Sequence, residues 1–370
     1  MSKIDWTDVT WNVTAGCRKV SEGCRNCWAI RTVPRLAGNG VKGYEQITNS
    51  KEQITNKSGK AKKLLNWSGK IELLEHNLQK PFKYGKKPKR VFVNSMSDLF
   101  HEDVPFDFVD KVMAVISLFS QHTFMILTKR PERMKEYFEK LFADYTPDEI
   151  MEKLTSLYSD ENFLGKDKPF PAMEDEAECF AHNYAMVHGI LSNLWLGVSV
   201  EDQKTADERI PVLLQIPAAK HFISLEPMLG AVDLSKYLGF DATITCHEKI
   251  TEDVGKAIIE MCNKAGAKKL LDWVIVGGES GAGARPMHPE WVRSIKDQCT
   301  MSNVQFYFKQ WGAYSMLNDK VANVKCKKIP HVSKMRSIKG YSDLFIKVGK
   351  KEAGHLLDGI EYRQIPDVKL

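Results

Sequence analysis

The amino-acid sequence predicts an α/β protein built as a complete or partial TIM-like (βα) barrel. Seven short apolar segments are rich in β-branched and aromatic residues, and most are followed by a segment of helical periodicity. Each apolar segment is nearly continuous rather than alternating, which is typical of parallel strands covered on both faces. This alternation of strands and helices favours a barrel, and the alternative is an open, doubly wound sheet.

The elements can be placed by their composition and their bounding residues. The expected strands are Thr10–Thr14, Arg90–Asn94, Thr123–Thr128, Leu194–Ser199, His221–Leu225, Trp273–Gly277 and Val304–Phe308. The expected helices are Cys27–Leu36, Phe106–Ser120, Pro131–Phe142, Asp202–Gln215 and Pro289–Ser302. Asp202 is suited to cap its helix, and Pro289 followed by Glu290 suits the first turn of the last helix.

Two charged segments of weak patterning interrupt this alternation, at about 143–186 and 232–269, and we interpret them as insertions. The predicted organisation is therefore a barrel domain over residues 1–314 and a C-terminal extension over residues 315–370. The Lys-rich stretches Lys60–Lys63 and Lys86–Arg90 predict solvated faces, with nucleic-acid contact as the less favoured interpretation.

Composition excludes several classes of protein. The chain has 370 residues, 43% of them hydrophobic and 27% charged, with a net charge of +6, which is typical of a globular protein and excludes disorder. No window approaches the roughly 18 consecutive apolar residues of a membrane span. The start, MSKIDWTDVTW, lacks the layout of a signal peptide. We therefore expect a cytoplasmic protein without membrane association.

Cys17, Cys24 and Cys27 lie close together with the spacing C-x6-C-x2-C, which favours a soft metal. The first His is the distant His76, so no fourth ligand is near in sequence. Three interpretations are open: an iron–sulfur cluster with one iron free for a small molecule, a zinc with a remote fourth ligand, and thiols that bind no metal. The other cysteines are expected to be ordinary half-buried side chains: Cys179, Cys246, Cys262, Cys299 and Cys326.

Polar residues follow nearly every predicted strand. Functional groups in a (βα) barrel lie at the C-terminal ends of the strands, so we expect these residues at the mouth of a site. The candidate site residues in these segments, including two glycines that let the backbone approach a ligand, are Asn94, Ser95, Ser97, Asp98, Lys129, Arg130, Ser199, Glu201, Glu226, Gly277, Gly278, Glu279, Ser280, Arg285, Lys309, Gln310 and Trp311. His101 and His288 are candidates for proton transfer or for structural hydrogen bonding.

Several blocks of sequence resemble the phage-associated three-Cys-motif family of unknown function, which is similar to the radical SAM superfamily. They include TWNVTAGCRKVSEGCRNCWA, VFVNSMSDLFHEDVP, HTFMILTKRPERM and LDWVIVGGESGAGARPMHPEWVRSIKDQC, and together they span residue 6 to about residue 314. The usual superfamily motif is C-x3-C-x2-C with an aromatic residue just before the last Cys. Here Trp28 follows the last Cys, and Val13 stands where the family commonly has Pro.

The resemblance implies a barrel of the radical SAM type in which Cys17, Cys24 and Cys27 hold a [4Fe-4S] cluster that binds S-adenosylmethionine. It also implies cofactor contacts from the residues after the second, fourth, fifth and sixth strands: Asn94, Ser95, Ser97, Asp98, Ser199, Glu201, Glu226, Gly277, Gly278, Glu279 and Ser280. A second group of largely cationic residues indicates a site for an anionic substrate: Lys129, Arg130, Arg285, Lys309, Gln310 and Trp311.

We therefore expect a radical-SAM-like iron–sulfur enzyme that uses S-adenosylmethionine to modify an unidentified substrate, with nucleic acid or a nucleotide favoured. The family also implies a three-Cys-motif partner protein. The alternative is a zinc-stabilised nucleic-acid-binding protein without radical chemistry, in which the cysteine loop is structural and the basic residues hold phosphates.

Overall fold

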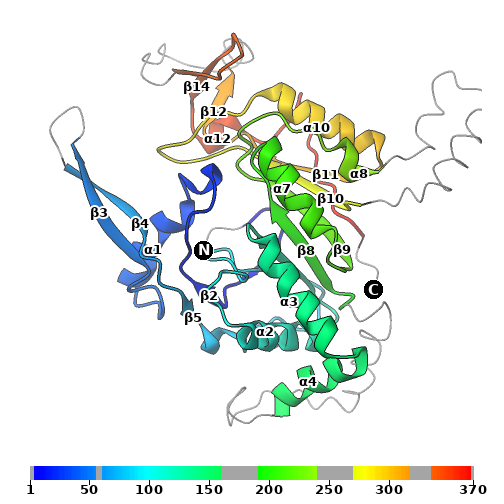
Figure 1. The fold of residues 1–370 in the computed structure, drawn as a ribbon. Coiled ribbons are helices and arrows are strands. Elements are labelled where there is room, and N and C mark those ends of the chain that lie inside the picture. Colours follow the sequence, from blue (N-terminus) through cyan, green and yellow to red (C-terminus); the bar gives the residue numbers. More distant parts are fainter. Residues whose placement is uncertain (1–3, 56–60, 160–190, 240–269, 317–334, 368–370) are drawn as a thin grey trace, which may run out of the picture. The chain divides into compact units, whose positions relative to one another are not determined.

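The seven predicted strands are present in the computed structural model, which describes residues 4–55, 61–159, 191–239, 270–316 and 335–367 (Figure 1). They make up one sheet, in the order β1-β6-β7-β8-β9-β10-β11. The chain divides into two compact units. The first comprises Met1–Gly197, Gln215–Ala219 and Val368–Leu370, and the second comprises Val198–Leu214 and Lys220–Asp367. Strand β8 (Leu194–Ser199) contributes residues to both units.

The first unit contains parallel strands joined by helices. Strand β6 (Arg90–Val93) pairs in parallel with β1 (Val9–Trp11) and with β7 (Thr123–Thr128). Helix α2 (Phe106–Leu118) connects β6 to β7, and α3 (Pro131–Asp144) follows β7. Helix α4 (Pro147–Ser159) contacts α2. Strands β6 and β7 are almost wholly buried, as the continuous apolar segments predict.

Between β1 and β6 the chain builds a smaller substructure beside the sheet. It consists of β2 (Thr14–Ala15), η1 (Glu22–Cys24), α1 (Trp28–Gly38), β3 (Thr48–Thr55), β4 (Ala61–Trp67), β5 (Glu72–Leu73), η2 (Glu75–Asn77) and η3 (Lys80–Lys83). Strands β3 and β4 form an antiparallel hairpin that contacts α1 (Figure 1). The sequence analysis missed this hairpin. Its second strand includes part of the Lys-rich stretch, of which Lys60 lies outside the described residues.

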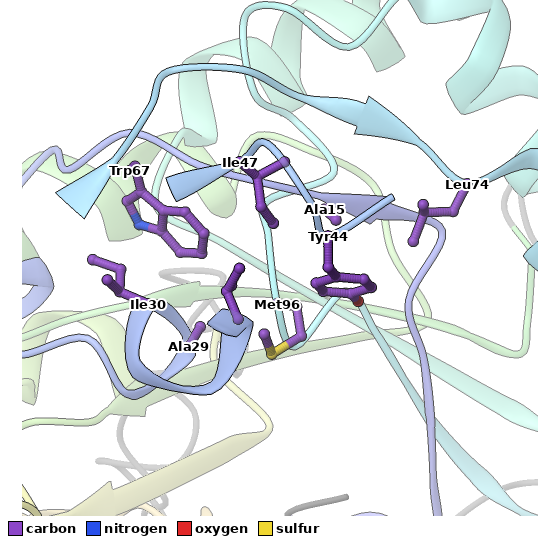
Figure 2. Close-up of a cluster of buried hydrophobic side chains, with 9 residues drawn as sticks. Ala15, Ala29, Ile30, Tyr44, Ile47, Trp67, Leu74 and Met96 are labelled. Carbon is purple, nitrogen blue, oxygen red and sulfur yellow. The ribbon is translucent and has the colours of Figure 1, made fainter. Parts of the chain in front are cut away.

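A buried hydrophobic cluster holds this substructure together. Ala29 and Ile30 from α1 meet Trp67 from the hairpin, together with Tyr44, Ile47, Leu74, Met96, Ala15 and Val33 (Figure 2). Apolar burial contributes about 25 cal/mol per Å². This packing therefore anchors the start of α1, and with it the loop that precedes the helix.

The second unit repeats the same alternation. Strand β10 (Trp273–Gly277) pairs in parallel with β9 (Lys220–Leu225) and with β11 (Gln305–Gln310). Helix α7 (Gln203–Leu213) precedes β9, and α10 (Pro289–Met301) connects β10 to β11. Asp202 caps α7 as predicted, because its carboxylate accepts a hydrogen bond from the Thr205 amide at 2.9 Å. Helix α8 (Ser235–Leu238) is a single turn.

The described residues that follow β11, up to Asp367, belong to the second unit. Strands β12 (Tyr314–Met316), β14 (Leu344–Lys347) and β13 (Met335–Ser337) form a small antiparallel sheet, followed by α12 (Lys350–Ala353). The last described segment then runs along β11, where the Phe308 amide donates to the Tyr362 carbonyl at 2.9 Å. This contact satisfies backbone groups on the outer edge of the sheet. The predicted boundary at residue 314 stays a prediction.

The predicted α/β class is confirmed, and the strands of the sheet follow one another in chain order. Within the described residues, β1 and β11 each have one strand neighbour in this sheet, so a closed barrel is not shown. The proposed insertions fall largely outside the described residues, as do Cys179, Cys246, Cys262 and Cys326. Of the helices in the described ranges, none is long and apolar enough to cross a membrane.

Candidate functional site

The clustered cysteines lie in one loop of the first unit, between β2 and α1. Cys24 ends η1, and Cys27 is the N-cap residue of α1. Gly16 introduces the loop with a φ of 95°, and a Cβ there would lie 2.1 Å from the Lys70 carbonyl oxygen, so only glycine fits. Cys17 and Cys27 pack against the hydrophobic cluster of Figure 2. The loop is therefore held at both ends.

The thiols of this loop influence one another electrostatically. Burial raises the pKa of the Cys17 thiol to about 12, and negative charge on Asp98, Cys24 and Cys27 adds to the rise while Arg130 opposes it. Burial also raises the pKa of Cys27, against the hydrogen bonds that a thiolate there receives from the first turn of α1. Negative charge on Cys24 thus acts on both of the other thiols.

Cys24 is the most acidic of the three thiols. Burial alone would raise its pKa, but the Lys129 ammonium and backbone hydrogen bonds from Val20 and Ser21 lower it below its usual value. Lys129 also acts to lower the pKa of Cys27. The structure thus places Lys129, which we expected to bind substrate, beside the cysteine loop.

The three cysteine sulfurs are ligands that a soft metal prefers, but they are not positioned to bind one metal centre together. Within the described ranges, no group of three or more His, Cys, Asp or Glu side chains has the geometry to hold a metal ion. Binding of a shared centre therefore requires the three thiols to reorient.

Arg130 and Asp98 form a buried ion pair next to this loop, with 3.2 Å between Arg130 Nη1 and Asp98 Oδ2. The Asp98 carboxylate also accepts from Thr128 Oγ1 at 2.7 Å and from the Lys129 amide at 3.0 Å. Asp98 is therefore engaged in joining the ends of β6 and β7. Its expected role as a cofactor ligand stays a prediction.

Glu102 links two arginines, and the sequence analysis did not single it out. Its Oε2 accepts from Arg130 Nε at 2.8 Å and its Oε1 from Arg18 Nη1 at 2.9 Å. Arg18 also donates to Asp103 at 3.1 Å. Because Arg18 lies inside the C-x6-C segment, this network ties the cysteine loop to the loop after β6. The available signal was the presence of opposite charges in the two segments, Arg18 in one and Glu102 with Asp103 in the other.

Acid should weaken this network. Burial raises the pKa of Glu102, but its hydrogen bonds, including that from Arg130, lower it from 4.5 to about 2. A carboxyl with a depressed pKa stabilises the fold above its unfolded-state pKa and loses that contribution as pH falls through the folded-state value. We expect the stability difference between wild type and Glu102→Gln to shrink between about pH 5 and about pH 2. Urea unfolding across that range measures it, and a difference independent of pH would contradict the assignment.

The polar residues after β6 mainly organise the chain around them. Asn94, at a φ of 64°, accepts hydrogen bonds from the amides of Val13 and Thr14 at 2.8 and 3.1 Å. Ser95 donates to Asn12 Oδ1, and Ser97 donates to the Thr14 carbonyl at 2.9 Å. These contacts hold the entry to the cysteine loop against the end of β6. They give the three residues a structural task that the sequence did not reveal.

His101 and His288 both make structural hydrogen bonds. His101 is fully buried, and its Nδ1 accepts from the Asp103 amide at 3.1 Å. Burial is the main cause that lowers the pKa of His101. His288 caps α10 by accepting from the Glu290 amide, and its Nε2 lies 3.0 Å from Asp343 Oδ2. Structural hydrogen bonding therefore describes these two histidines better than proton transfer does.

In the second unit, Glu201 and Arg209 form another buried ion pair. Their side chains are 1% and 7% exposed, and Arg209 Nη1 lies 3.1 Å from Glu201 Oε2. The same nitrogen donates to the carbonyl oxygen of Ser199 at 2.7 Å. Two residues expected to meet the cofactor are thus bound to one arginine of α7.

Removal of Glu201 should destabilise the protein strongly. A buried charge that loses its partner costs about 3–5 kcal/mol, so Glu201→Ala should lower the free energy of unfolding by about 3 kcal/mol. Glu208→Ala on the same helix breaks only the exposed pair with Lys204, which should cost less than about 1 kcal/mol. Chemical denaturation measures both variants. Equal effects would show that the buried pair is not the stabilising feature.

Glu226, after β9, reaches across β10 to Lys309 on β11. The distance between Lys309 Nζ and Glu226 Oε2 is 2.6 Å. Gly277 permits this approach, because a Cβ there would lie 3.0 Å from Glu226 Oε1. That Oε1 atom is buried and has no hydrogen-bond partner among the described residues. Among the described residues of this unit, it is the one buried side-chain acceptor without a hydrogen-bond partner.

The expectation that the GGES segment contacts a ligand has a competing structural explanation. A Cβ on Gly278 would lie 2.1 Å from the Trp311 carbonyl oxygen, and one on Gly312 would lie 2.3 Å from the Glu279 carbonyl oxygen. Gln310 Nε2 donates to the Gly278 carbonyl at 2.7 Å. The glycines are thus needed where the chains after β10 and β11 cross.

Glu279 and Arg285 satisfy each other. Arg285 donates through Nε and Nη2 to the two carboxylate oxygens at 2.9 and 2.8 Å, and its amide donates to Oε2 at 2.8 Å. Ser280, next in the chain, is half-buried. Trp311 Nε1 donates to the Leu356 carbonyl at 2.8 Å. Glu279 and Arg285 are thus bound to each other within one loop, and Trp311 is bound to the C-terminal segment.

The comparisons with known proteins add little to this geometry. No curated protein matches the chain. Solved structures similar to it include a spore photoproduct lyase double mutant with bound AdoMet and dinucleoside spore photoproduct, at 9% identity and a TM-score of 0.31, covering 91% of this chain and 68% of that one. A spore photoproduct lyase complexed with dinucleoside spore photoproduct matches at 8% identity and a TM-score of 0.31, covering 90% of this chain and 67% of that one. Residues 1–366 match the family described as "Protein of unknown function (DUF5131)", and the chain belongs to that family.

Proposed function

We propose that this chain is an iron–sulfur enzyme of the radical SAM type, in which Cys17, Cys24 and Cys27 hold a [4Fe-4S] cluster. The observation that carries the proposal is that the three thiols lie in one loop anchored at both ends, where negative charge on Cys24 and Cys27 acts on the Cys17 thiol. Three thiolate ligands leave one iron of such a cluster open to a small molecule. The same proposal includes a fold that is a (βα) barrel of the radical SAM type.

The surrounding cations support a site that holds negative charge. Lys129 favours the thiolate forms of Cys24 and Cys27, and Arg130 Nη1 lies 4.0 Å from Cys17 Sγ. Thiolates, not thiols, are metal ligands. When bound, the cluster and S-adenosylmethionine would supply one-electron cleavage of a sulfonium, a reaction that requires a water-excluding site. The hydrophobic side chains of Figure 2 pack against Cys17 and Cys27, so they cover one side of the loop.

The substrate class, nucleic acid or a nucleotide, is the less supported part of the proposal. Three of the expected substrate-binding cations are paired internally: Arg130 with Asp98, Arg285 with Glu279, and Lys309 with Glu226. A three-Cys-motif partner protein and a cytoplasmic location likewise remain proposals.

The test is an electron paramagnetic resonance spectrum of anaerobically reconstituted, dithionite-reduced protein, recorded with and without S-adenosylmethionine. We expect a [4Fe-4S]⁺ signal that shifts when the cofactor is added. A cluster signal indifferent to the cofactor would reject the radical SAM assignment. Colourless protein with one tightly bound zinc would instead support the alternative, a zinc-stabilised nucleic-acid-binding protein.

A further inference from the structure

We infer that Arg130 is a positioning residue that fixes the cysteine loop to the end of the sheet and supplies the positive charge beside Cys17. The inference rests on the proposed function, since it concerns a cluster held by that loop. It goes further by giving a task to a residue that the sequence analysis had assigned to substrate binding.

The guanidinium of Arg130 joins two separate segments of the first unit. Its Nε donates to Glu102 Oε2 at 2.8 Å, and its Nη1 donates to Asp98 Oδ2 at 3.2 Å, both in the loop after β6. Its Nη2 donates to the Arg18 carbonyl at 3.4 Å, and Nη1 lies 4.0 Å from Cys17 Sγ. One planar cation thereby spans the β6 loop and the cysteine loop.

The position of this cation is set by the sheet. Arg130 directly precedes α3, and its side chain is 10% exposed. Its carboxylate partner Asp98 is itself fixed by Thr128 Oγ1 and by the amides of Lys129 and Phe100. Lysine cannot reproduce these contacts, because a single ammonium lacks the forked set of donors of a guanidinium. The geometry therefore depends on arginine and not on positive charge alone.

Two measurable consequences follow for a cluster bound by the loop. A cluster gains negative charge when it is reduced, and a nearby buried cation stabilises that charge because solvent screens it little. Arg130 should therefore make reduction easier. The clamp on the Arg18 carbonyl should also slow cluster loss, because the loop cannot move away without breaking the hydrogen bond from Arg130 Nη2.

The experiment compares reconstituted full-length variants by redox titration followed by electron paramagnetic resonance, and by the rate of iron release to a chelator. Arg130→Gln should shift the midpoint potential to a more negative value by about 59 mV, a tenfold change for one electron. It should also release iron roughly tenfold faster. Arg130→Lys should keep a midpoint potential close to that of wild type, but it should still release iron faster than wild type. Lys135→Gln removes a positive charge from the same helix, where Lys135 pairs with Glu139, and should match wild type in both measurements.

The outcomes separate this inference from the proposed function. Wild-type protein that takes up no cluster overturns the proposed function, and this inference with it. Wild-type and Arg130→Gln proteins that both take up the cluster, with equal potentials and release rates, overturn the inference alone. Should Arg130→Gln not fold, Glu102→Gln replaces it, because the Glu102 side chain is 45% exposed and anchors Arg130 from the loop after β6. If Glu102→Gln then released iron at the wild-type rate, the claim that Arg130 holds the cysteine loop in place would be rejected.

Discussion

Replacement of Cys17, Cys24 or Cys27 by Ala is expected to abolish cluster uptake by the reconstituted protein. Each thiol is one of only three candidate ligands in the loop, and two ligands cannot hold a cubane stably. Neither neighbouring turn offers another thiol, since Gly16 and Trp28 flank the segment. Iron and sulfide content, with the absorbance of the cluster, measures the effect in each variant.

Cys299 provides the matched control for this experiment. It is fully buried in α10 of the second unit, where burial raises the pKa of its thiol. Cys299→Ala should therefore retain the iron content of wild type. Equal iron content in all four variants would reject the ligand assignment. Loss of iron from Cys299→Ala alone would indicate that the metal is bound at Cys299 and not in the cysteine loop.

Substitution of Gly278 by Ala is expected to destabilise the protein by about 3 kcal/mol or more. Overpacking of a core by added methyl groups typically costs about 1–3 kcal/mol, because flexible side chains move aside. Here the added Cβ would lie 2.1 Å from the Trp311 carbonyl oxygen and 2.9 Å from the Gly312 nitrogen, which are backbone atoms. Relief of this clash requires the chains after β10 and β11 to separate. Thermal and urea unfolding measure the loss.

Gly230 supplies the control in the same unit. A Cβ at Gly230 would meet only the Asp202 Cβ, at the ordinary contact distance of 3.8 Å. Gly230→Ala should change the free energy of unfolding by no more than about 0.5 kcal/mol. If Gly278→Ala is equally well tolerated, the crossing of the two chains does not require glycine at position 278.

The main strands were predictable because burial on both faces leaves a clear signal in the sequence. Strands β7, β8 and β10 begin and end at the predicted residues, each a continuous apolar run. The hairpin was missed for the opposite reason. Its first strand, TNSKEQIT, is mostly polar, and the apolar residues of its second strand, AKKLLNW, do not alternate with polar ones, so no periodic pattern distinguishes the two strands from a loop.

The positions of the candidate residues were more predictable than their partners. Glu226 and Glu279 follow β9 and β10 within two residues, as the sequence predicts, whereas Lys309, expected after the last strand, lies inside β11. The sequence did not reveal that Glu279 would be bound on both oxygens by Arg285, or that Gly277 would let Glu226 reach Lys309. Pairing of this kind depends on which strands are neighbours, and sequence spacing does not report that.

The amino-acid sequence was sufficient for the α/β class, the order of the elements, and the cysteine loop as the chemically distinctive segment. Those features depend on local patterns: apolar runs, capping residues and the short spacing of three thiols. The tertiary structure alone decided which polar side chains are committed to the fold. Hydrogen bonds and ion pairs such as Arg130–Asp98 join residues that are distant in the chain, so their existence depends on the packing of the sheet and not on any local pattern.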